Sequence, residues 1–400
     1  MIKPKTFLRL TVTTVLLWLI TFAESFANDA IVIGIDADMS SVAAEGGNAI
    51  YRGAKIAVDE INAAGGVFNR PLELVVKDHR GNPARGIRNL QAFKQIPNLS
   101  AVLGGVHTPV VLNELAFIHT NQLLFLVPWA AGTPIIENGF APNFVFRSSV
   151  RDSEAASVLL GAIHQRGLKR VALILERTGW GRSNQASMGK VAETLGIEVA
   201  HIAWINWRQT SFSDEIKQIA ASGAQAVVLV SNAPEGAVAL GALLDNNETA
   251  VLPVVSHWGI AGGSFVKLIG LQRLNSLDLS VLQTFHFSLP TIDQSKASRV
   301  LAAYQEQFDA DATQSSIAGQ VGLAHAYDLL HMLAIAMRQA GSIESDKVRQ
   351  ALTELKDYAG LVKHYTSPFA ESQDALWAED YILTRYDENG FLVPRTTADE

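Results

Sequence analysis

The sequence predicts an α/β protein with two lobes, each built around a parallel β-sheet. The chain has 400 residues, which is more than one ordinary α/β domain needs. Short apolar runs that suit buried strands alternate with amphipathic helical patterns along most of its length. These runs fall into two series, one before residue 130 and one after residue 170, so we expect two sheets.

The strand-like runs are bounded by glycine, proline and other turn residues. The expected strands are Ile31–Ile35, Leu72–Lys77, Ala101–Gly104 and Leu123–Val127, then Val171–Leu175, Val199–Trp204, Ala226–Val230 and Val251–Val255, and finally Tyr381–Tyr386. The expected helices are Asn48–Ala63, Pro83–Gln95, Val110–His119, Asp152–Arg166, Arg182–Leu195, Phe212–Ala221, Pro234–Leu244, Asp293–Phe308, Ala318–Gln339 and Ser345–Leu355.

The stretch around the first predicted helix shows the β-α-β unit most clearly. Apolar residues such as Ile50, Ala54 and Ile61 recur at helical spacing. Two glycines, Gly65 and Gly66, then favour the end of the helix, since glycine adopts positive φ at no steric cost. A β-rich run follows, and Ile31–Ile35 supplies the strand before the helix.

The same stretch resembles a known signature. The run EINAAGGVFNRPLELVVKDHRGNP, residues 60–83, is similar to the N-terminal signature of periplasmic solute-binding proteins of the leucine/isoleucine/valine-binding family. That family serves ABC importers for branched-chain and other amino acids, amides, urea and some aromatic acids. The resemblance covers nearly the whole chain, although it is dense only to about Gly105 and weak after Ser367.

The resemblance implies the type I periplasmic-binding-protein fold, in which two Rossmann-like lobes are joined by a hinge with several crossovers. It divides the chain into residues 28–147 as the first part of lobe 1, 148–282 as lobe 2, 283–357 as the second part of lobe 1, and 358–400 as a C-terminal segment that crosses back to lobe 2. Composition alone would also allow two sequential domains.

Residues 1–27 have the pattern of a cleaved signal peptide. Basic Lys3, Lys5 and Arg9 precede the apolar run Leu10–Phe22, and Ser25-Phe26-Ala27 forms a small-x-small cleavage site. A membrane anchor is the alternative, but about a dozen apolar residues fall short of the roughly 20 that span a bilayer. The absence of cysteine excludes a lipid anchor. We therefore expect export to the periplasm.

Composition and motifs exclude several classes of function. The formal net charge of −7 becomes −9 once the +2 of residues 1–27 is removed, which disfavours nucleic acid as a partner. The sequence has neither HExxH nor GxSxG, and no phosphate-binding or dinucleotide-binding glycine motif follows the first strand. No catalytic residue, metal site or cofactor is therefore expected.

Candidate ligand-binding residues of lobe 1 follow its predicted strands, because parallel sheets bind ligands at the carboxyl ends of their strands. The resemblance assigns Thr108 to a ligand carboxylate, with a plain helix cap as the alternative, and His107 to the cleft lining. It places Trp129, Ala130 and Ala131 where the family has small and hydroxylated residues. Backbone N–H groups of Ala130 and Ala131 would still hold an anion, while Trp129 faces either the cleft or the core.

Candidates of lobe 2 follow the second series. Trp180, in a glycine-flanked loop, matches an aromatic residue that stacks over the ligand. Asn232 either contacts the ligand or caps the helix at Pro234. Trp258 stands where amino-acid binders carry an acid for the ligand's ammonium group.

The missing acid puts amino-acid specificity in doubt. Three acids near the first strand, Glu45, Asp36 and Asp38, are possible replacements, although acids at a strand end are more often solvated or capping. Trp180 and Trp258, on facing loops, suit an aromatic, amide or quaternary-ammonium ligand at least as well as an amino acid.

Three functional hypotheses follow. The first is a monomeric solute-binding component of an ABC importer, with a small ligand and a membrane permease as its partners. The second is a sensor or delivery protein for a non-amino-acid ligand, such as an aromatic acid, an amide, urea or a quaternary ammonium compound, without a permease. The third, a periplasmic enzyme, lacks a recognisable nucleophile.

Overall fold

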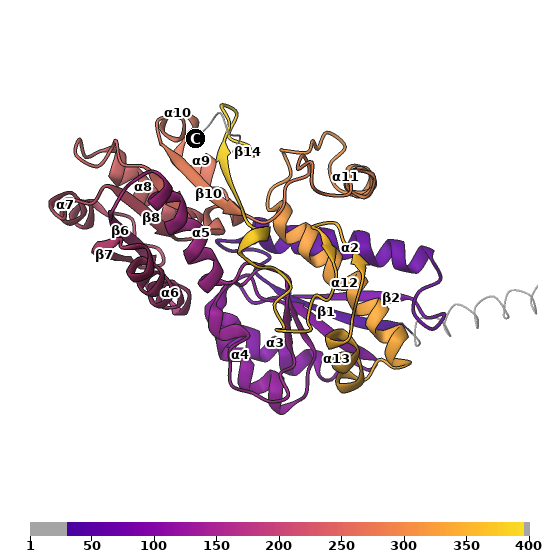
Figure 1. The fold of residues 1–400 in the computed structure, drawn as a ribbon. Helices are drawn as coiled ribbons and strands as arrows, with labels where there is room; N and C mark the ends of the chain where they lie inside the picture. The colour runs from indigo at the N-terminus through magenta and orange to yellow at the C-terminus, as the bar shows by residue number, and fades with distance from the viewer. Residues whose placement is uncertain (1–29, 396–400) are drawn as a thin grey trace, which may run out of the picture.

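The computed structural model describes residues 30–395 as two lobes that lie side by side and are joined near the middle of the molecule (Figure 1). The predicted signal peptide lies outside the described residues. Within residues 30–395, no helix has the length and apolar character needed to cross a membrane.

The first lobe contains a sheet in which all neighbouring strands are parallel. Its strand order is β2 (Leu72–Asp78), β1 (Ile31–Ala37), β3 (Leu99–Gly104), β4 (Phe125–Val127) and β5 (Val145–Arg147). The four predicted strands are confirmed. Strand β5 was not among the expected strands, because three residues are too few to show a strand pattern.

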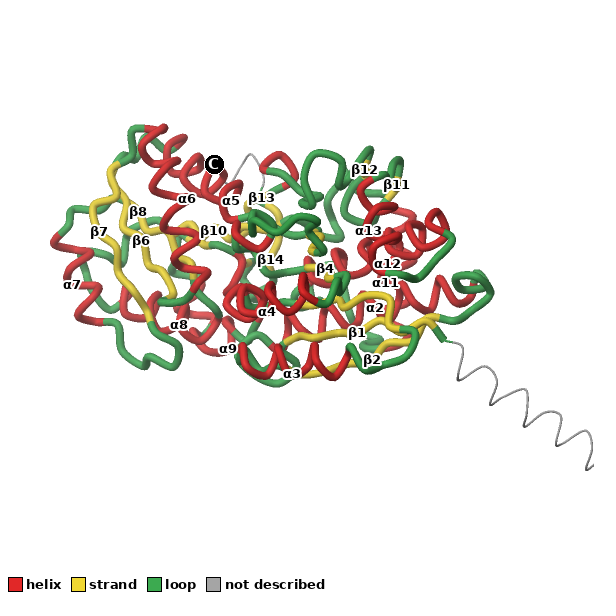
Figure 2. Tube along the Cα trace, turned by 90° about the horizontal axis from the view of Figure 1, so that it is seen from below, coloured by secondary structure: helices red, strands yellow, loops and turns green. Residues whose placement is uncertain are grey.

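Helices cover both faces of this sheet, as parallel strands require. Figure 2 shows the same lobe from below. The core on one face includes residues of α2 (Ala44–Ala63) and α12 (Gln320–Ala340), which pack on each other, and α13 (Ser345–Thr353) lies against α12. The core on the other face includes residues of α3 (Pro83–Phe93) and α4 (Thr108–Thr120).

The second lobe contains a mixed sheet. Its strand order is β14 (Leu392–Pro394), β13 (Ile382–Tyr386), β10 (Leu279–Gln283), β9 (Val254–Ser256), β8 (Ala226–Val230), β6 (Arg170–Glu176) and β7 (Glu198–Ile205). The last two strands of the chain add antiparallel to an otherwise parallel sheet. Strand β10 was not among the expected strands, but Val281 and its neighbours pair with β9 and β13.

Helices again lie on both faces of the second sheet. Helices α5 (Asp152–Gln165) and α6 (Gly179–Leu195) contribute to the core on one face. Helices α7 (Ser213–Ala221), α8 (Ala233–Leu244), α9 (Phe265–Ile269) and α10 (Leu271–Leu274) contribute to the core on the other.

The chain passes between the lobes after β5, after β10 and before β13. Helix α11 (Gln294–Gln307) follows the second crossing and contacts α2 of the first lobe. A two-stranded ribbon, β11 (Tyr358–Ala359) and β12 (His364–Tyr365), then packs on α12, where the Asp328 carboxylate accepts the backbone N–H groups of Leu361 and Val362. The C-terminal segment therefore stays on the first lobe before it enters the second sheet.

Candidate ligand-binding cleft

Loops at the carboxyl ends of both sheets meet between the lobes and enclose a small pocket, which we call the cleft pocket. Its lining includes seven of the residues predicted from the sequence: His107, Thr108, Trp129, Ala131, Trp180, Asn232 and Trp258. The other lining residues are Val106, Pro109, Glu176, Trp207 and Gly259. The loops after β3 and β4 of one sheet thus meet the loops after β6, β8 and β9 of the other.

On the first lobe, Thr108 opens α4 and His107 occupies the N-cap position. The Oγ1 atom of Thr108 accepts a hydrogen bond of 3.1 Å from the Gly132 N–H. The Nε2 atom of His107 lies 2.9 Å from a carboxylate oxygen of Asp38. Burial opposes ionisation of Asp38, but hydrogen bonds from His107 and from backbone N–H groups outweigh it and lower the pKa of this carboxyl. Asp38 therefore positions His107 from behind the pocket wall.

Trp129 leaves the first lobe and reaches the second. Its indole is 3% exposed and lies 5.3 Å, centroid to centroid, from that of Trp258. Four glycines surround it, and a Cβ atom on any of them would come within 3.5 Å of the ring: Gly46, Gly262, Gly319 and Gly322. Since Gly262 belongs to the second lobe and the other three to the first, Trp129 fills space between the lobes.

The two residues after Trp129 differ in their roles. Ala131 lines the cleft pocket. Ala130 belongs to the core of the first lobe, and its N–H donates to the Gly105 carbonyl at 2.9 Å. The expectation that the Ala130 N–H holds an anion is therefore wrong, because this donor is already used within the lobe.

On the second lobe, Trp180 lies in the first turn of α6 and not in a loop, since the helix begins at Gly179. Its Nε1–H donates to Asp152 at 3.1 Å, and its ring meets the edge of His257 at 5.1 Å. Trp258 begins the 3₁₀-helix η2 (Trp258–Gly262) and is 1% exposed. With its polar edge already bonded, Trp180 offers the pocket an apolar wall.

Asn232 is hydrogen-bonded to Glu176, an acid that is not among the predicted site residues. One oxygen of Glu176 accepts both the backbone N–H and the side-chain amide of Asn232, each at 2.7 Å. The other oxygen accepts the Trp207 Nε1–H at 2.6 Å. Burial raises the pKa of Glu176 to about 7, against the lowering effect of these bonds. Asn232 occupies an N-cap position, but its side chain makes no cap bond.

Glu176 and Trp207 were not predicted, although both lie at the carboxyl ends of predicted strands. Glu176 follows the predicted strand Val171–Leu175 directly, so its position at a strand end was a usable signal. Trp207 lies two residues beyond the end of β7, so the same signal applied to it. Its Nε1–H bonds Glu176, and its ring lies 5.4 Å from that of His107.

Of the three acids proposed to replace the missing one at Trp258, Glu45 and Asp36 lie outside the cleft pocket. Glu45 is absent from the cleft pocket and accepts a hydrogen bond of 2.8 Å from Ser264, across the lobes. Asp36 is buried and accepts from Asn89, and burial raises its pKa to about 7. Asp36 does not line the cleft pocket, where the described lining contains a single carboxylate, that of Glu176.

The cleft pocket is nearly filled by its own walls. Its volume is about 10 Å³, which holds about one water molecule. The lobes touch at Trp129, which lines it, and outside it through the Glu45–Ser264 bond. Among residues 30–395, no group of three histidine, aspartate or glutamate side chains is placed to hold a metal ion.

Comparison with known proteins identifies relatives of this arrangement. A family model described as "Periplasmic binding protein" matches residues 30–390. Leu/Ile/Val-binding protein homolog 3 from Brucella melitensis is 27% identical over 252 residues, which are 61% of this chain and 67% of that protein.

Solved structures share the fold. The periplasmic binding protein type 1 from Bordetella pertussis has a TM-score of 0.82 at 19% identity, covering 92% of this chain and 100% of that one. The branched-chain amino acid transporter substrate-binding protein LivJ from Streptococcus pneumoniae, in complex with isoleucine, has a TM-score of 0.77 at 19% identity over the same shares. The chain therefore belongs to the periplasmic binding protein family and to its leucine/isoleucine/valine-binding type.

Proposed function

We propose that this protein is the periplasmic solute-binding component of an ABC importer, which captures a small ligand between its lobes and presents it to a membrane permease. The observation that carries the proposal is the convergence of strand-end loops from both sheets on one pocket. The protein would act as a monomer in the periplasm, with no catalytic step and no nucleic-acid partner.

Closure of the lobes is the working step. A ligand that touches both lobes binds the closed form more tightly than the open form, and so shifts the population towards closure. Because the cleft pocket is almost full in the closed arrangement, the ligand would enter an open form and displace contacts that the tryptophans make with each other.

The pocket offers different groups on its two sides. Thr108 accepts a hydrogen bond from Gly132 and, within residues 30–395, donates none, which leaves its hydroxyl hydrogen for a ligand oxygen. Trp180 and Trp258 contribute apolar surface. The names of the relatives suggest branched-chain amino acids, but both oxygens of Glu176 already accept hydrogen bonds, so the pocket presents no unpaired carboxylate to an ammonium group.

Titration calorimetry of two cleft variants tests this proposal. A thermal-shift screen of amino acids, amides, aromatic acids, betaines and short carboxylates first identifies a ligand. We expect Thr108→Ala and Trp180→Ala each to weaken its binding about tenfold, which corresponds to about 1.4 kcal/mol. The exposed Thr194→Ala on α6 is the matched control and should bind as the wild type does. Unchanged affinity in both cleft variants would show that the ligand binds elsewhere.

A further inference from the structure

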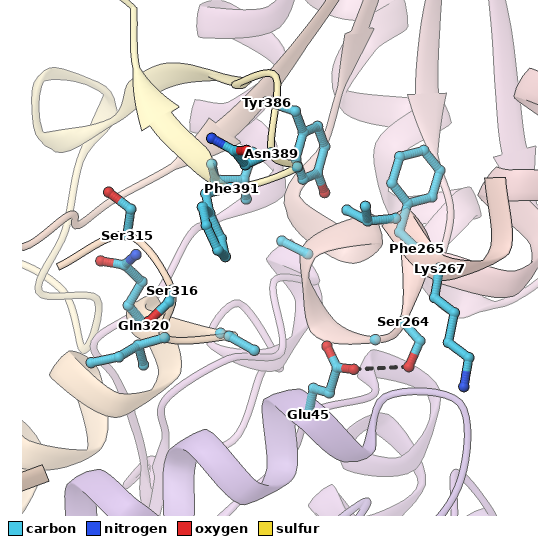
Figure 3. A pocket seen from close by; sticks show the side chains of 18 of the residues that line it. Glu45, Ser264, Phe265, Lys267, Ser315, Ser316, Gln320, Tyr386, Asn389 and Phe391 are labelled. Atoms are coloured by element: carbon cyan, nitrogen blue, oxygen red, sulfur yellow. Dashed lines mark hydrogen bonds between the residues drawn. The ribbon is translucent and has the colours of Figure 1, made fainter. Parts of the chain in front are cut away.

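A second, larger cavity lies between the lobes beside the crossing that follows β10 (Figure 3). We call it the crossover pocket, and its volume of about 590 Å³ is typical of small-molecule sites. Its walls come from the start of α2, the segment from η2 to α10, the second crossing, the loop before α12 and the β13–β14 hairpin. Both lobes therefore contribute to it.

Much of the wall is aromatic. Tyr386 and Phe391 come from the β13–β14 hairpin, and Phe265 comes from α9, with its ring 5.7 Å from that of Tyr386. Two lining residues are unusually exposed for their type, Phe391 at 38% and Leu271 at 44%. Apolar side chains gathered and left open at the rim of a cavity indicate an apolar occupant.

The lining contains one carboxylate, that of Glu45. Figure 3 shows Glu45 extending from α2 towards Ser264, to which it is bonded at 2.8 Å, while the amino group of Lys267 points away from the cavity. Burial and then the negative charge of Glu45 raise the pKa of Tyr386, so the field of this carboxylate reaches the aromatic wall.

We propose that the crossover pocket binds an organic cation with an apolar body, an aryl- or alkylammonium compound, whose charge pairs with Glu45. An ammonium group beside a carboxylate and over aromatic rings gains both ion-pair and cation–π attraction. An organic anion of the same shape would meet the Glu45 charge without a compensating cation. The inference rests on the proposed function, since a ligand here would also bridge the two lobes.

Trp129 separates this pocket from the cleft pocket. Its indole lines the cleft pocket and also lies within 3.5 Å of where a Cβ atom of Gly319 would be, and Gly319 lines the crossover pocket. A body as large as a phenyl ring has no room in the 10 Å³ of the cleft pocket. The crossover pocket is thus the part of the interlobe space that accommodates such a ligand as the lobes now stand.

Calorimetry with two probes of similar shape and opposite charge tests the inference at pH 7. Benzyltrimethylammonium should bind the wild-type protein, and 3-phenylpropionate should bind at least tenfold more weakly. Glu45→Gln should weaken binding of the cation at least tenfold. Ser264→Ala removes the same interlobe hydrogen bond but keeps the carboxylate, and should change affinity less than threefold. Glu248→Gln, an exposed acid outside both pockets, should change it less than twofold.

The other outcomes distinguish failure of this inference from failure of the proposed function. Equal binding of the two probes, or full affinity in Glu45→Gln, would overturn the inference. If the cation fails to bind while another solute binds in a way that depends on Thr108 and Trp180, the inference falls and the proposed function stands. If no solute of either panel binds, both fall.

Discussion

The indole of Trp129 lies between glycines that belong to α2, η2, α12 and the residue before α12. A Cβ atom at Gly322 would lie 2.7 Å from this ring, closer than real Cβ contacts come. Gly161, a helical glycine of α5, has no neighbouring atom within 4 Å of the same added atom. Both glycines are helical, but only Gly322 is crowded by neighbouring atoms. Substituting each by alanine therefore distinguishes the effect of packing on stability from the effect of helix propensity.

We expect Gly322→Ala to lower the free energy of unfolding by about 1–3 kcal/mol, because an overpacked core forces the indole or the helix to shift. Gly161→Ala should raise it by about 0.5–1 kcal/mol, as alanine does in an open helical position. Urea unfolding of both variants measures these changes. If Gly322→Ala is as stable as Gly161→Ala, the indole of Trp129 can shift to make room for the added methyl group.

Glu176 should make stability depend on pH. Its pKa is about 7 in the folded protein and near 4.5 when unfolded, so the folded state holds a proton that the unfolded state loses between these values. This contribution to stability is complete below pH 4.5 and is lost as the pH rises through 7. It amounts at most to about 3 kcal/mol.

Glu176→Gln removes this titration. The stability of the variant relative to wild type should therefore rise between pH 5 and pH 8, as measured by urea unfolding at both values. The exposed Glu248→Gln serves as the control, and its difference from wild type should stay constant. A constant difference for Glu176→Gln as well would show that Glu176 is ionised in the folded protein throughout this range.

At the scale of elements, one carboxylate attaches the β11–β12 ribbon to α12. Asp328 is fully buried and accepts the N–H groups of Leu361 and Val362, as well as the hydroxyls of Tyr358 and Tyr365. Burial raises the pKa of this carboxyl, although the hydrogen bonds favour its charged form. Asp328 therefore anchors the ribbon, while the segment after it is held to the first lobe by Arg147 of β5, which pairs with the buried Asp374.

Asp328→Ala should destabilise the protein by about 3 kcal/mol or more, since each buried donor left unpaired costs about 1–3 kcal/mol. Hydrogen exchange at the amides of residues 361 and 362 should accelerate by more than exchange in β6 does, since β6 lies in the other lobe. Asp328→Asn retains one acceptor, so its stability should lie between those of the wild type and Asp328→Ala. If these amides remain as protected in Asp328→Ala as in wild type, the ribbon is held by packing instead.

The sequence predicted most elements because their signals are local. Buried strands such as Ala226–Val230 are apolar throughout, and amphipathic helices lie between them. Strands β5 and β10 were missed for different reasons. Strand β5 has only three residues, and β10 continues into the second crossing without a turn residue, so pattern alone does not show where the strand ends.

For the candidate site, the sequence predicted which loops approach each other, but not the contacts that their side chains make. Strand-end positions brought Thr108 and Trp180 to the pocket. The hydrogen-bond partners were not predictable, because they join distant segments: Trp180 to Asp152, Asn232 to Glu176, and Glu45 to Ser264. These partners decide which polar atoms remain for a ligand.

At the scale of the whole molecule, capture of a solute between the lobes requires the lobes to move relative to each other. Three crossings connect them, and the contacts across the space between them include the Trp129 ring among glycines of both lobes, the Glu45–Ser264 bond and the bond from the Thr133 N–H to Ser183 Oγ. A protein that captures a solute by closure needs an open state that is accessible and a closed state that the ligand favours.

Measuring the distance between the lobes with and without ligand tests whether they close on the ligand. The chain lacks cysteine, so Ala116→Cys on α4 and Ser213→Cys on α7, both exposed, would give one dye site in each lobe. We expect energy transfer between the dyes to rise when a ligand found in the thermal-shift screen is added. Thr108→Ala should shift this rise to higher ligand concentration. A ligand that binds with no change in energy transfer would contradict capture by lobe closure.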